Sequence, residues 1–414
     1  MRQDTGFEQC MKCSICTVYC PMMEVNPAFP GPKQAGPDGE RYRLKDPLFF
    51  DKALNYCLNC KRCEVACPSG VKIGDIIQTA IVTYGRTAPV LRDRMLANTD
   101  FVGCAASAFA PVVNTVVASK PAKALMDCTL GIDHRRSFPA YSSERFDVWF
   151  RKHAESVQAK YRDSVAYFHG CYVNYNYPQL GKDLVRILNA TGYGVNLLEN
   201  EKCCGVPLIS NGLHKAAARN ARINLASIRL SGTTVLTTSS SCTLAIRDSY
   251  PEVLGIDNSD IREKVVLATR FLFENVESGR IKLSFRDDYH ARIAYHTPCH
   301  LQKLGWNIYS VRMLEMIPGV ELVRLDQQCC GIAGTFGFKK ENYEHSQKIG
   351  EKLFSLIRDA APDFVATDCE TCKWQIEMST GVKVLNPISV IAEALDIEKT
   401  TILNNNENQY NNLK

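Results

Sequence analysis

The chain has 414 residues, of which 45% are hydrophobic and 22% charged, and its mean hydropathy is −0.17. This composition is typical of a folded globular protein rather than a disordered or membrane-embedded one, and the length predicts about three domains. The net charge of +5 comes without any block of lysine and arginine, which argues against nucleic acid as a partner. A weakly basic chain is compatible with an anionic membrane surface.

Cysteine is the residue type in excess, with 19 in the chain. The first residues, MRQDTGFEQC, show neither the basic nor the apolar region of a secretory signal peptide, which predicts a cytoplasmic protein. Clustered cysteines in a reducing compartment indicate metal or redox chemistry more often than disulfides.

Residues 1–85 are predicted to form an α-helical ferredoxin domain that holds two [4Fe–4S] clusters. The run Cys-x-x-Cys-x-x-Cys-x-x-x-Cys-Pro occurs twice. Three closely spaced thiolates bind one cluster and the fourth cysteine binds the other. We therefore expect Cys10, Cys13, Cys16 and Cys67 at the first cluster and Cys57, Cys60, Cys63 and Cys20 at the second. Two structural zinc sites are the alternative, although zinc usually shows two separated cysteine pairs. The Pro/Gly-rich stretch 26–46 between the runs is predicted to be a loop.

Residues 86–163 are interpreted as a helical connector with a possible membrane-facing segment. The stretch from Phe101 to Ser119 carries no charge, but Pro111, Asn114 and several small residues make it a poor spanning helix. An interfacial helix pair that offers Phe101, Val102, Phe109, Val112, Val113, Val116 and Val117 to lipid is one hypothesis. Packing between the flanking domains is the other. Cys104 and Cys128 match no pattern, and we expect both to be buried thiols.

The rest of the chain contains an internal duplication, with units predicted at 164–280 and 281–397. Cys171, the pair Cys203–Cys204 and Cys242 recur at nearly constant separation as Cys299, the pair Cys329–Cys330 and Cys369. In each unit, apolar strands alternate with amphipathic helices, which predicts two α/β units with parallel sheets. The cysteines follow the strands, at the edge where such sheets bind ligands. The Asn-rich residues 398–414 are predicted to be a disordered tail.

The second unit carries five cysteines that could bind one redox-active metal centre: Cys299, Cys329, Cys330, Cys369 and Cys372. In the first unit, counting from Cys242 places Ala245 where the fifth cysteine is expected, so that site is altered or lost. Buried structural thiols remain the alternative for each adjacent pair. Near these cysteines lie His169, His214, His296 and His300, which are more typical of hydrogen-bonded loop residues than of ligands.

The chain shows no dinucleotide fingerprint, no P-loop and no His-Glu-x-x-His motif. It is therefore expected to bind neither flavin nor nicotinamide, and to receive electrons from a partner that oxidises the substrate. A relay of single electrons between partner redox centres is the favoured function. A subunit that reduces a substrate at the five-cysteine site is the competing one.

The Cys-Cys-Gly units resemble those of heterodisulfide reductase B subunits, glycolate oxidase iron–sulfur subunits and lactate-utilisation proteins. Together with the ferredoxin domain and with VNPAFPGPKQAGPDGER, IDHRRSFP, YFHGCYVNYNYPQLGKDL, QCCGIAGTFGFKKENY and TDCETCKWQIEMST, they resemble the C subunits of anaerobic glycerol-3-phosphate dehydrogenases. The resemblance covers the chain to about residue 397. It implies a peripheral protein at the cytoplasmic face of the inner membrane, with flavin-containing A and B subunits and menaquinone as partners. It also implies that the five-cysteine site holds a non-cubane [4Fe–4S] cluster.

Overall fold

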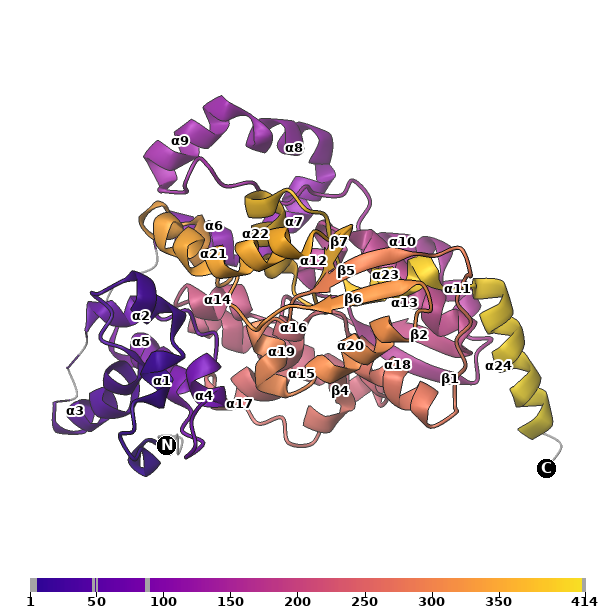
Figure 1. Ribbon diagram of the computed structural model, residues 1–414, viewed down its shortest axis with the longest axis horizontal. Helices are drawn as coiled ribbons and strands as arrows, with labels where there is room; N and C mark the ends of the chain where they lie inside the picture. Colours follow the sequence, from indigo (N-terminus) through magenta and orange to yellow (C-terminus); the bar gives the residue numbers. More distant parts are fainter. Residues whose placement is uncertain (1–5, 47–48, 50, 86–89, 412–414) are drawn as a thin grey trace.

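The computed structural model describes residues 6–46, 49, 51–85 and 90–411. It contains helices throughout and two four-stranded parallel sheets, so the predicted fold class is confirmed. Figure 1 shows the N-terminal ferredoxin domain beside the two α/β units, and a helical projection that stands above them.

The ferredoxin domain consists of short helices within and between the two cysteine runs. They are the 3-10 helices η1 (Phe7–Gln9) and η3 (Lys52–Tyr56), the π-helix η2 (Gln34–Asp38), and α1 (Ile15–Val18), α2 (Pro21–Val25), α3 (Gly39–Lys45), α4 (Arg62–Val65) and α5 (Ile73–Tyr84). The prediction of a loop over 26–46 is wrong for its second half, where η2 and α3 lie. Ala35, Gly36 and Pro37 are buried there, and this packing overrides the turn-forming composition.

The connector consists of α6 (Leu91–Ala97), α7 (Thr99–Ala108), α8 (Ala110–Ala118), α9 (Lys120–Leu130), α10 (Phe146–His153) and α11 (Glu155–Gln158). Helices α7 and α8 meet at an angle of 108°, and α8 and α9 form the projection at the top of Figure 1. Asn114, in the middle of α8, ties this helix to the segment before α10, because its side chain donates to Tyr141 O and accepts from Tyr141 N. Arg92 and Glu341 pair at 2.8 Å and tie α6 to the second unit.

Each α/β unit is built on its own parallel sheet. The first sheet has the order β2-β1-β3-β4, with β1 (Asp163–Phe168), β2 (Tyr193–Leu197), β3 (Val235–Thr237) and β4 (Val265–Leu267). Its helices are α12 (Gly170–Tyr175), α13 (Pro178–Ala190), α14 (Val206–Ser210), α15 (His214–Ser231), α16 (Ser240–Leu244), η4 (Ala245–Ser249), α17 (Tyr250–Glu252), η5 (Arg262–Lys264) and α18 (Ala268–Glu277).

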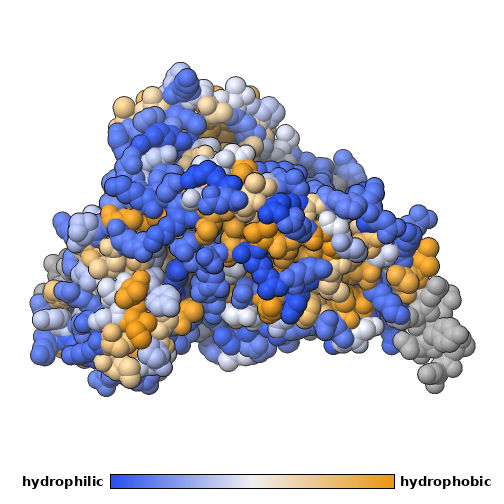
Figure 2. Space-filling view, in the orientation of Figure 1, coloured by the Kyte–Doolittle hydropathy of each residue, from blue (hydrophilic) through white to orange (hydrophobic). Residues whose placement is uncertain are grey.

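The second sheet has the equivalent order β6-β5-β7-β8, with β5 (Ala291–Tyr295), β6 (Val320–Arg324), β7 (Phe364–Ala366) and β8 (Val384–Leu385). Its helices are α19 (Cys299–Leu304), α20 (Asn307–Glu315), η6 (Phe336–Phe338), η7 (Lys340–Asn342), α21 (Tyr343–Ala360), α22 (Glu370–Thr380) and α23 (Pro387–Ala394). The space-filling view shows apolar side chains at the surface over β5 and β6 (Figure 2).

A continuous apolar core joins the two units. Tyr167 and Leu184 from the first unit lie in the same buried cluster as Ile293, Leu314 and Ile391 from the second. Burial of apolar surface stabilises this arrangement, because each such side chain contributes about 1.5–3 kcal/mol when removed from water. The shared core therefore holds the two cysteine-bearing edges at a fixed separation.

The C-terminal segment is a helix rather than a disordered tail over its described residues. Helix α24 (Ile397–Asn411) begins directly after the second unit. Asn404 is buried, accepts from Lys282 N at 3.0 Å and donates to Lys282 O at 2.8 Å. Thr400 is also buried and accepts from Ser284 N. These polar contacts hold α24 against the second unit, although its sequence has no apolar periodicity. Residues 412–414 of the predicted tail lie outside the described residues.

Candidate metal centres

The ferredoxin cysteines gather in two groups that follow the crossed pattern expected from the sequence. Burial raises the pKa of the Cys16 thiol, and the charges of Cys10, Cys67 and Cys13 add to this rise. Burial likewise raises the pKa of Cys20 to about 12, and here the neighbours are Cys60 and Cys57. The fourth cysteine of each run thus lies with the first three of the other run.

Left-handed backbone between the cysteines bends each run around its centre. Lys12 and Ser14 have φ angles of 59° and 65°, and Asn59 and Lys61 have 51° and 62°. Non-glycine residues adopt such angles rarely and at a cost in free energy. The same pair of turns in both runs indicates that the loops are shaped to aim three thiols at one point.

A buried ion-pair network supports the second ferredoxin centre. Lys61 follows Cys60 and contacts the carboxylates of Glu64, at 3.2 Å, and of Asp75. Burial alone would lower the pKa of Lys61, but the two carboxylates raise it above its ordinary value. Lys303 from the second α/β unit pairs with Glu64 at 2.8 Å, so the network joins the ferredoxin domain to the second unit.

The five predicted cysteines of the second unit meet at the carboxyl edge of its sheet. The sulfur atoms of Cys330 and Cys372 are 3.3 Å apart. Burial raises the pKa of the Cys299 thiol, and the nearby charges of Cys329, Cys330 and Cys369 raise it further. A hydrogen bond from Cys372 lowers the pKa of Cys369 to about 6, which favours the thiolate. Thiolates are the ligands of iron–sulfur clusters, so the donor set fits such a group.

Glycine is required where the Cys329–Cys330 loop turns back. Gly331 has a φ of +86°, and a Cβ placed there would lie 2.0 Å from Ser346 O. The N–H of Gly331 donates to the sulfur of Cys329 at 3.4 Å. Only glycine allows this loop to approach the backbone of α21 so closely, because any side chain would collide with it.

The second ferredoxin centre lies against the five-cysteine site. The charge of Cys60 acts on both Cys299 and Cys329, raising the pKa of each thiol in addition to burial. Arg62 donates to Gln327 O at 3.1 Å, and His300 contacts Asn59 O at 3.4 Å. Cys329 belongs to the same buried cluster as the ferredoxin core. The two thiol groups are therefore neighbours in space, although most of the chain separates them in sequence.

The first unit brings four cysteines together: Cys171, Cys203, Cys204 and Cys242. Cys203 lies beside Cys171 and Cys204, and Cys204 lies beside Cys242, close enough for each thiol to shift the pKa of its neighbour. Asp100 on α7 accepts from Cys203 N at 2.9 Å, and Thr99 at the start of that helix lies beside Cys171 and Cys203. Sequence analysis missed both connector residues, because nothing in their local pattern links them to cysteines so distant in the chain.

The strand register shows which cysteines of the two units are equivalent. Ala166 in β1 pairs with Val235 in β3, and Ala294 in β5 pairs with Val365 in β7. Counting the same number of residues forward from Val235 and from Val365 reaches Cys242 and Cys372, so these two cysteines are equivalent. The proximity of Cys204 to Cys242 then matches that of Cys330 to Cys372.

The sequence alignment of Cys242 with Cys369, and of Ala245 with the missing cysteine, is therefore wrong. The residue equivalent to Cys369 is Ser239, and each precedes the first turn of its helix as the N-cap. The cause is the longer loop after Cys330, which carries η6 and η7 and shifts all later residues of the second unit.

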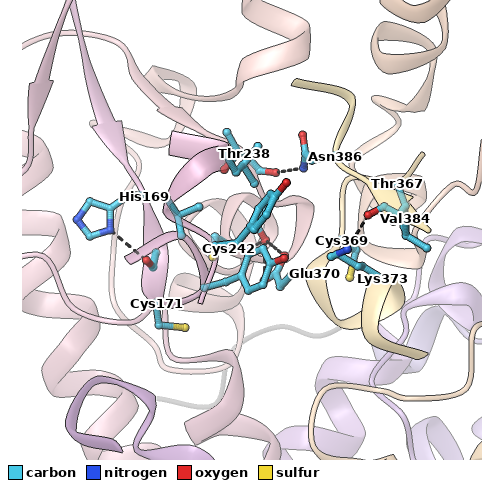
Figure 3. A pocket seen from close by; sticks show the side chains of 16 residues that line it. His169, Cys171, Thr238, Cys242, Thr367, Cys369, Glu370, Lys373, Val384 and Asn386 are labelled. Atoms are coloured by element: carbon cyan, nitrogen blue, oxygen red, sulfur yellow. Dashed lines mark hydrogen bonds between the residues drawn. The ribbon is translucent and has the colours of Figure 1, made fainter. Parts of the chain in front are cut away.

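A narrow crevice lies between the two cysteine sites (Figure 3). Cys171 and Cys242 line one side and Cys369 lines the other. Ser239 donates to the carboxylate of Glu370, with oxygen distances of 2.9 and 3.1 Å, across the boundary between the units. Burial raises the pKa of Glu370 to about 8. Tyr172, Tyr177, Leu180 and Val384 give the crevice a largely apolar wall.

The four histidines near the cysteines differ in their partners. His169 contacts Gly170 O at 3.0 Å and Glu201 at 3.3 Å, and His300 contacts Ser241 Oγ at 3.0 Å. In contrast, the ring nitrogens of His214 and His296 are buried and unpartnered among the described residues. Burial lowers the pKa of each of these two imidazoles to about 4, so both are neutral near pH 7.

Cys104 and Cys128 are exposed, so the prediction that both are buried thiols is wrong. Cys104 lies on α7, where it accepts from Arg145 at 3.3 Å, and Cys128 lies on α9. Both helices have a solvent-exposed face, which the composition of the segment does not reveal. Neither cysteine belongs to any of the four thiol groups.

Among the described residues, no single helix is long and apolar enough to cross a membrane. Helices α7 and α8 reach that length and composition only together, across their 108° bend. Phe109, Val112 and Val116 are 68%, 64% and 51% exposed, whereas Val113 and Val117 are half-buried.

Comparison with known proteins places these features in two domain families. The 4Fe-4S dicluster domain matches residues 6–71, and the cysteine-rich domain CCG matches residues 165–247 and 293–377. The chain is 55% identical over 396 residues to the C subunit of anaerobic glycerol-3-phosphate dehydrogenase from Escherichia coli K12, covering 95% of this chain and 99% of that protein.

More distant relatives also align over nearly the whole chain. The B subunit of fumarate reductase (CoM/CoB) from Methanothermobacter marburgensis is 26% identical over 421 residues, which are 95% of this chain and 73% of that protein. The glycolate oxidase iron-sulfur subunit of Escherichia coli K12 is 24% identical over 429 residues, which are 96% of each chain.

Proposed function

The chain belongs to the family of anaerobic glycerol-3-phosphate dehydrogenase C subunits, and from this we propose that it relays electrons from flavin-containing A and B subunits to membrane quinone, menaquinone in particular. The same hypothesis makes it a peripheral protein that anchors those subunits at the cytoplasmic face of the inner membrane. Iron–sulfur centres supply one-electron transfer when bound, which suits a step between a flavin and a quinone.

The thiol groups provide sites for three centres in this proposal. Cys10, Cys13, Cys16 and Cys67 would hold the first [4Fe–4S] cluster, and Cys57, Cys60, Cys63 and Cys20 the second. A non-cubane [4Fe–4S] cluster would be held by Cys299, Cys329, Cys330, Cys369 and Cys372. The matched ferredoxin and cysteine-rich families support iron–sulfur binding by both parts of the chain.

The observation that carries the relay is the contact between the second ferredoxin group and the five-cysteine site. Cys60 acts electrostatically on Cys299 and Cys329, and Arg62, His300 and Lys303 hold the two parts together. A ferredoxin that served an unrelated partner would not need to bury its cysteine loop against a second thiol group. Two neighbouring iron–sulfur centres held in fixed positions would let a single electron pass from one to the other.

Membrane attachment is assigned to the projection formed by α8 and α9 (Figures 1 and 2). Its exposed apolar residues are Phe109, Val112, Val116 and Leu125. Lys120 and Lys123 lie on the same helical pair and could meet lipid phosphates. Thr99 and Asp100, which contact the first-unit cysteines, lie on α7 at the base of this projection.

The test is reconstitution of the complete complex from A and B subunits, this chain and vesicles that contain menaquinone. We expect glycerol-3-phosphate to reduce menaquinone only when the chain is present, and Cys372→Ser to abolish this reduction. Cys104→Ser is the matched control, because Cys104 lies outside all four groups, and it should leave the rate unchanged. Equal menaquinone reduction without the chain would overturn the proposal.

The crevice between the cysteine sites favours a second candidate function, a heterodisulfide or thiol reductase that uses the five-cysteine site itself. The crevice has a largely apolar wall and lies between Cys242 and Cys369, and it would have to widen to admit a small substrate. The purified chain with a reduced dye and disulfides distinguishes the two functions. Turnover by the chain alone would support the reductase, and its absence together with menaquinone reduction in the complex would support the relay.

A further inference from the structure

His296 is a buried histidine whose ring has no partner of its own among the described residues. It follows β5 directly, is 1% exposed, and its backbone N–H extends the sheet by donating to Ala366 O at 3.0 Å. Both ring nitrogens lack hydrogen bonds. Leaving a buried donor unsatisfied is costly, so such a group in a native protein calls for a partner.

Strand geometry places the His296 side chain on the face that carries the thiols. Successive side chains of a strand alternate between the two faces of its sheet, so His296 shares a face with Ala294. Ala294 packs in the buried cluster that contains Cys330, Cys369 and Cys372. The charge of Arg62, which also acts on Cys329, reaches His296 as well.

The duplicated unit gives an independent view of the same position. Counting from Cys171 and Cys299, the residue equivalent to His296 is Phe168. Phe168 packs in the cluster that contains Cys203, Cys204 and Cys242, and its ring and the sulfur of Cys242 both approach Gly170. Phe168 therefore lines the thiol site of the first unit, and His296 presents an imidazole at the equivalent position of the second unit.

We propose that His296 donates its ring N–H to a sulfur atom of the cluster held at the five-cysteine site, and thereby raises the reduction potential of that cluster. A hydrogen bond to an anionic cluster becomes stronger when the cluster gains an electron, so it favours the reduced state. Five thiols already supply enough ligands, which leaves the imidazole the role of donor rather than ligand. This inference rests on the proposed cluster at that site.

A redox titration of the full chain tests the proposal. Electron paramagnetic resonance follows the five-cysteine centre during the titration and gives its reduction potential. We expect His296→Phe, which copies the first unit, to make the centre about tenfold harder to reduce, a downward shift of about 59 mV for a one-electron couple. His296→Gln keeps an N–H donor and should restore part of the shift. His214→Phe is the matched control, because the ring of His214 is also unpartnered but lies in the first unit.

A second measurement needs no variant that might fail to fold. Pulsed electron paramagnetic resonance on protein labelled with ¹⁵N-histidine should show a weak nitrogen coupling to the signal that Cys372→Ser removes. Where His296→Phe folds, this coupling should disappear. An unchanged potential, a coupling that survives His296→Phe, or no coupling at all would overturn the proposal, and so would a coupling of the strength of iron-bound imidazole. The parent signal and menaquinone reduction report on the proposed function separately, since both would persist if only the role of His296 were wrong.

Discussion

Ser239 and Cys369 occupy equivalent positions, each as the N-cap of the helix that carries the last cysteine of its unit. The first unit therefore presents a hydroxyl where the second presents a thiol. The two residues also lie at the boundary between the units, where Ser239 donates to Glu370, the residue after Cys369. The duplicated sites thus differ by one side-chain atom at this position.

Ser239→Cys should complete a five-thiol set in the first unit, because the new sulfur replaces an oxygen at the position that Cys369 fills in the second. We expect more iron and acid-labile sulfide per chain, or a new paramagnetic signal. Ala245→Cys is the control, since it adds a thiol at the position chosen by sequence alignment but not by strand register. An equal gain from both variants would contradict the equivalence of Ser239 and Cys369.

Cys330→Ser or Cys372→Ser should remove a paramagnetic centre, whereas Cys242→Ser should leave that signal intact. The reason is that Cys330 and Cys372 lie 3.3 Å apart within the five-cysteine site, and Cys242 belongs to the other unit. Electron paramagnetic resonance of anaerobically purified variants checks this. Loss of the same signal from all three variants would show that the two sites share one centre.

Cys20→Ser should disturb the second ferredoxin cluster rather than the first, because Cys20 lies with Cys57, Cys60 and Cys63. Spectra of the variant should retain the signal that depends on Cys10, Cys13 and Cys16. Cys67→Ser provides the reciprocal control and should disturb the first cluster. Loss of the first centre alone in Cys20→Ser would refute the crossed assignment.

Val112→Asp combined with Val116→Asp should release the protein from vesicles while it stays folded. Losing two apolar contacts, each worth about 1.5–3 kcal/mol when fully buried in lipid, should weaken binding by more than roughly tenfold. Both positions are more exposed than Val113 and Val117, where aspartate would also disturb packing. Leu230→Asp is the control, because Leu230 is 79% exposed in the first unit, away from the projection. Sedimentation of the double variant with vesicles as complete as that of the parent would exclude this surface.

Lys61→Met should destabilise the ferredoxin domain by about 3–5 kcal/mol, since it leaves Glu64 and Asp75 buried without their shared cation. Denaturant unfolding and cluster retention measure the loss. Lys72→Met removes an exposed partner of Glu252 and should cost about 1 kcal/mol or less. Similar losses from both variants would show that the buried network contributes no more than a surface pair.

Sequence periodicity was sufficient to predict the two parallel sheets and the ferredoxin domain, because both depend on local patterns of apolar residues and cysteines. The pairing of Ala166 with Val235 and of Ala294 with Val365 was not predictable, since the register between strands depends on tertiary packing. This is why the alignment of Cys242 failed after the longer loop behind Cys330.

Other parts of the site depend on contacts between distant residues. Thr99 and Asp100 reach the first-unit cysteines from α7, and His296 differs from an ordinary core histidine only in lacking partners. Asn404 and Thr400 hold helix α24 through polar contacts, which the pattern of apolar residues does not predict. Such features become visible only when the chain is folded.

The contacts of the ferredoxin domain also bear on the order of events during synthesis. Three of its tethers, from Glu24 to Lys352, from Arg62 to Gln327 and from Glu64 to Lys303, reach into the second α/β unit, and Lys72 pairs with Glu252 in the first. At about 5–20 residues per second, the N-terminal domain leaves the ribosome roughly 10–50 s before these tethers exist. During that interval the loop around Cys60 is not covered by the second unit, because Cys299 and His300, which lie against it in the complete chain, have not yet been synthesised.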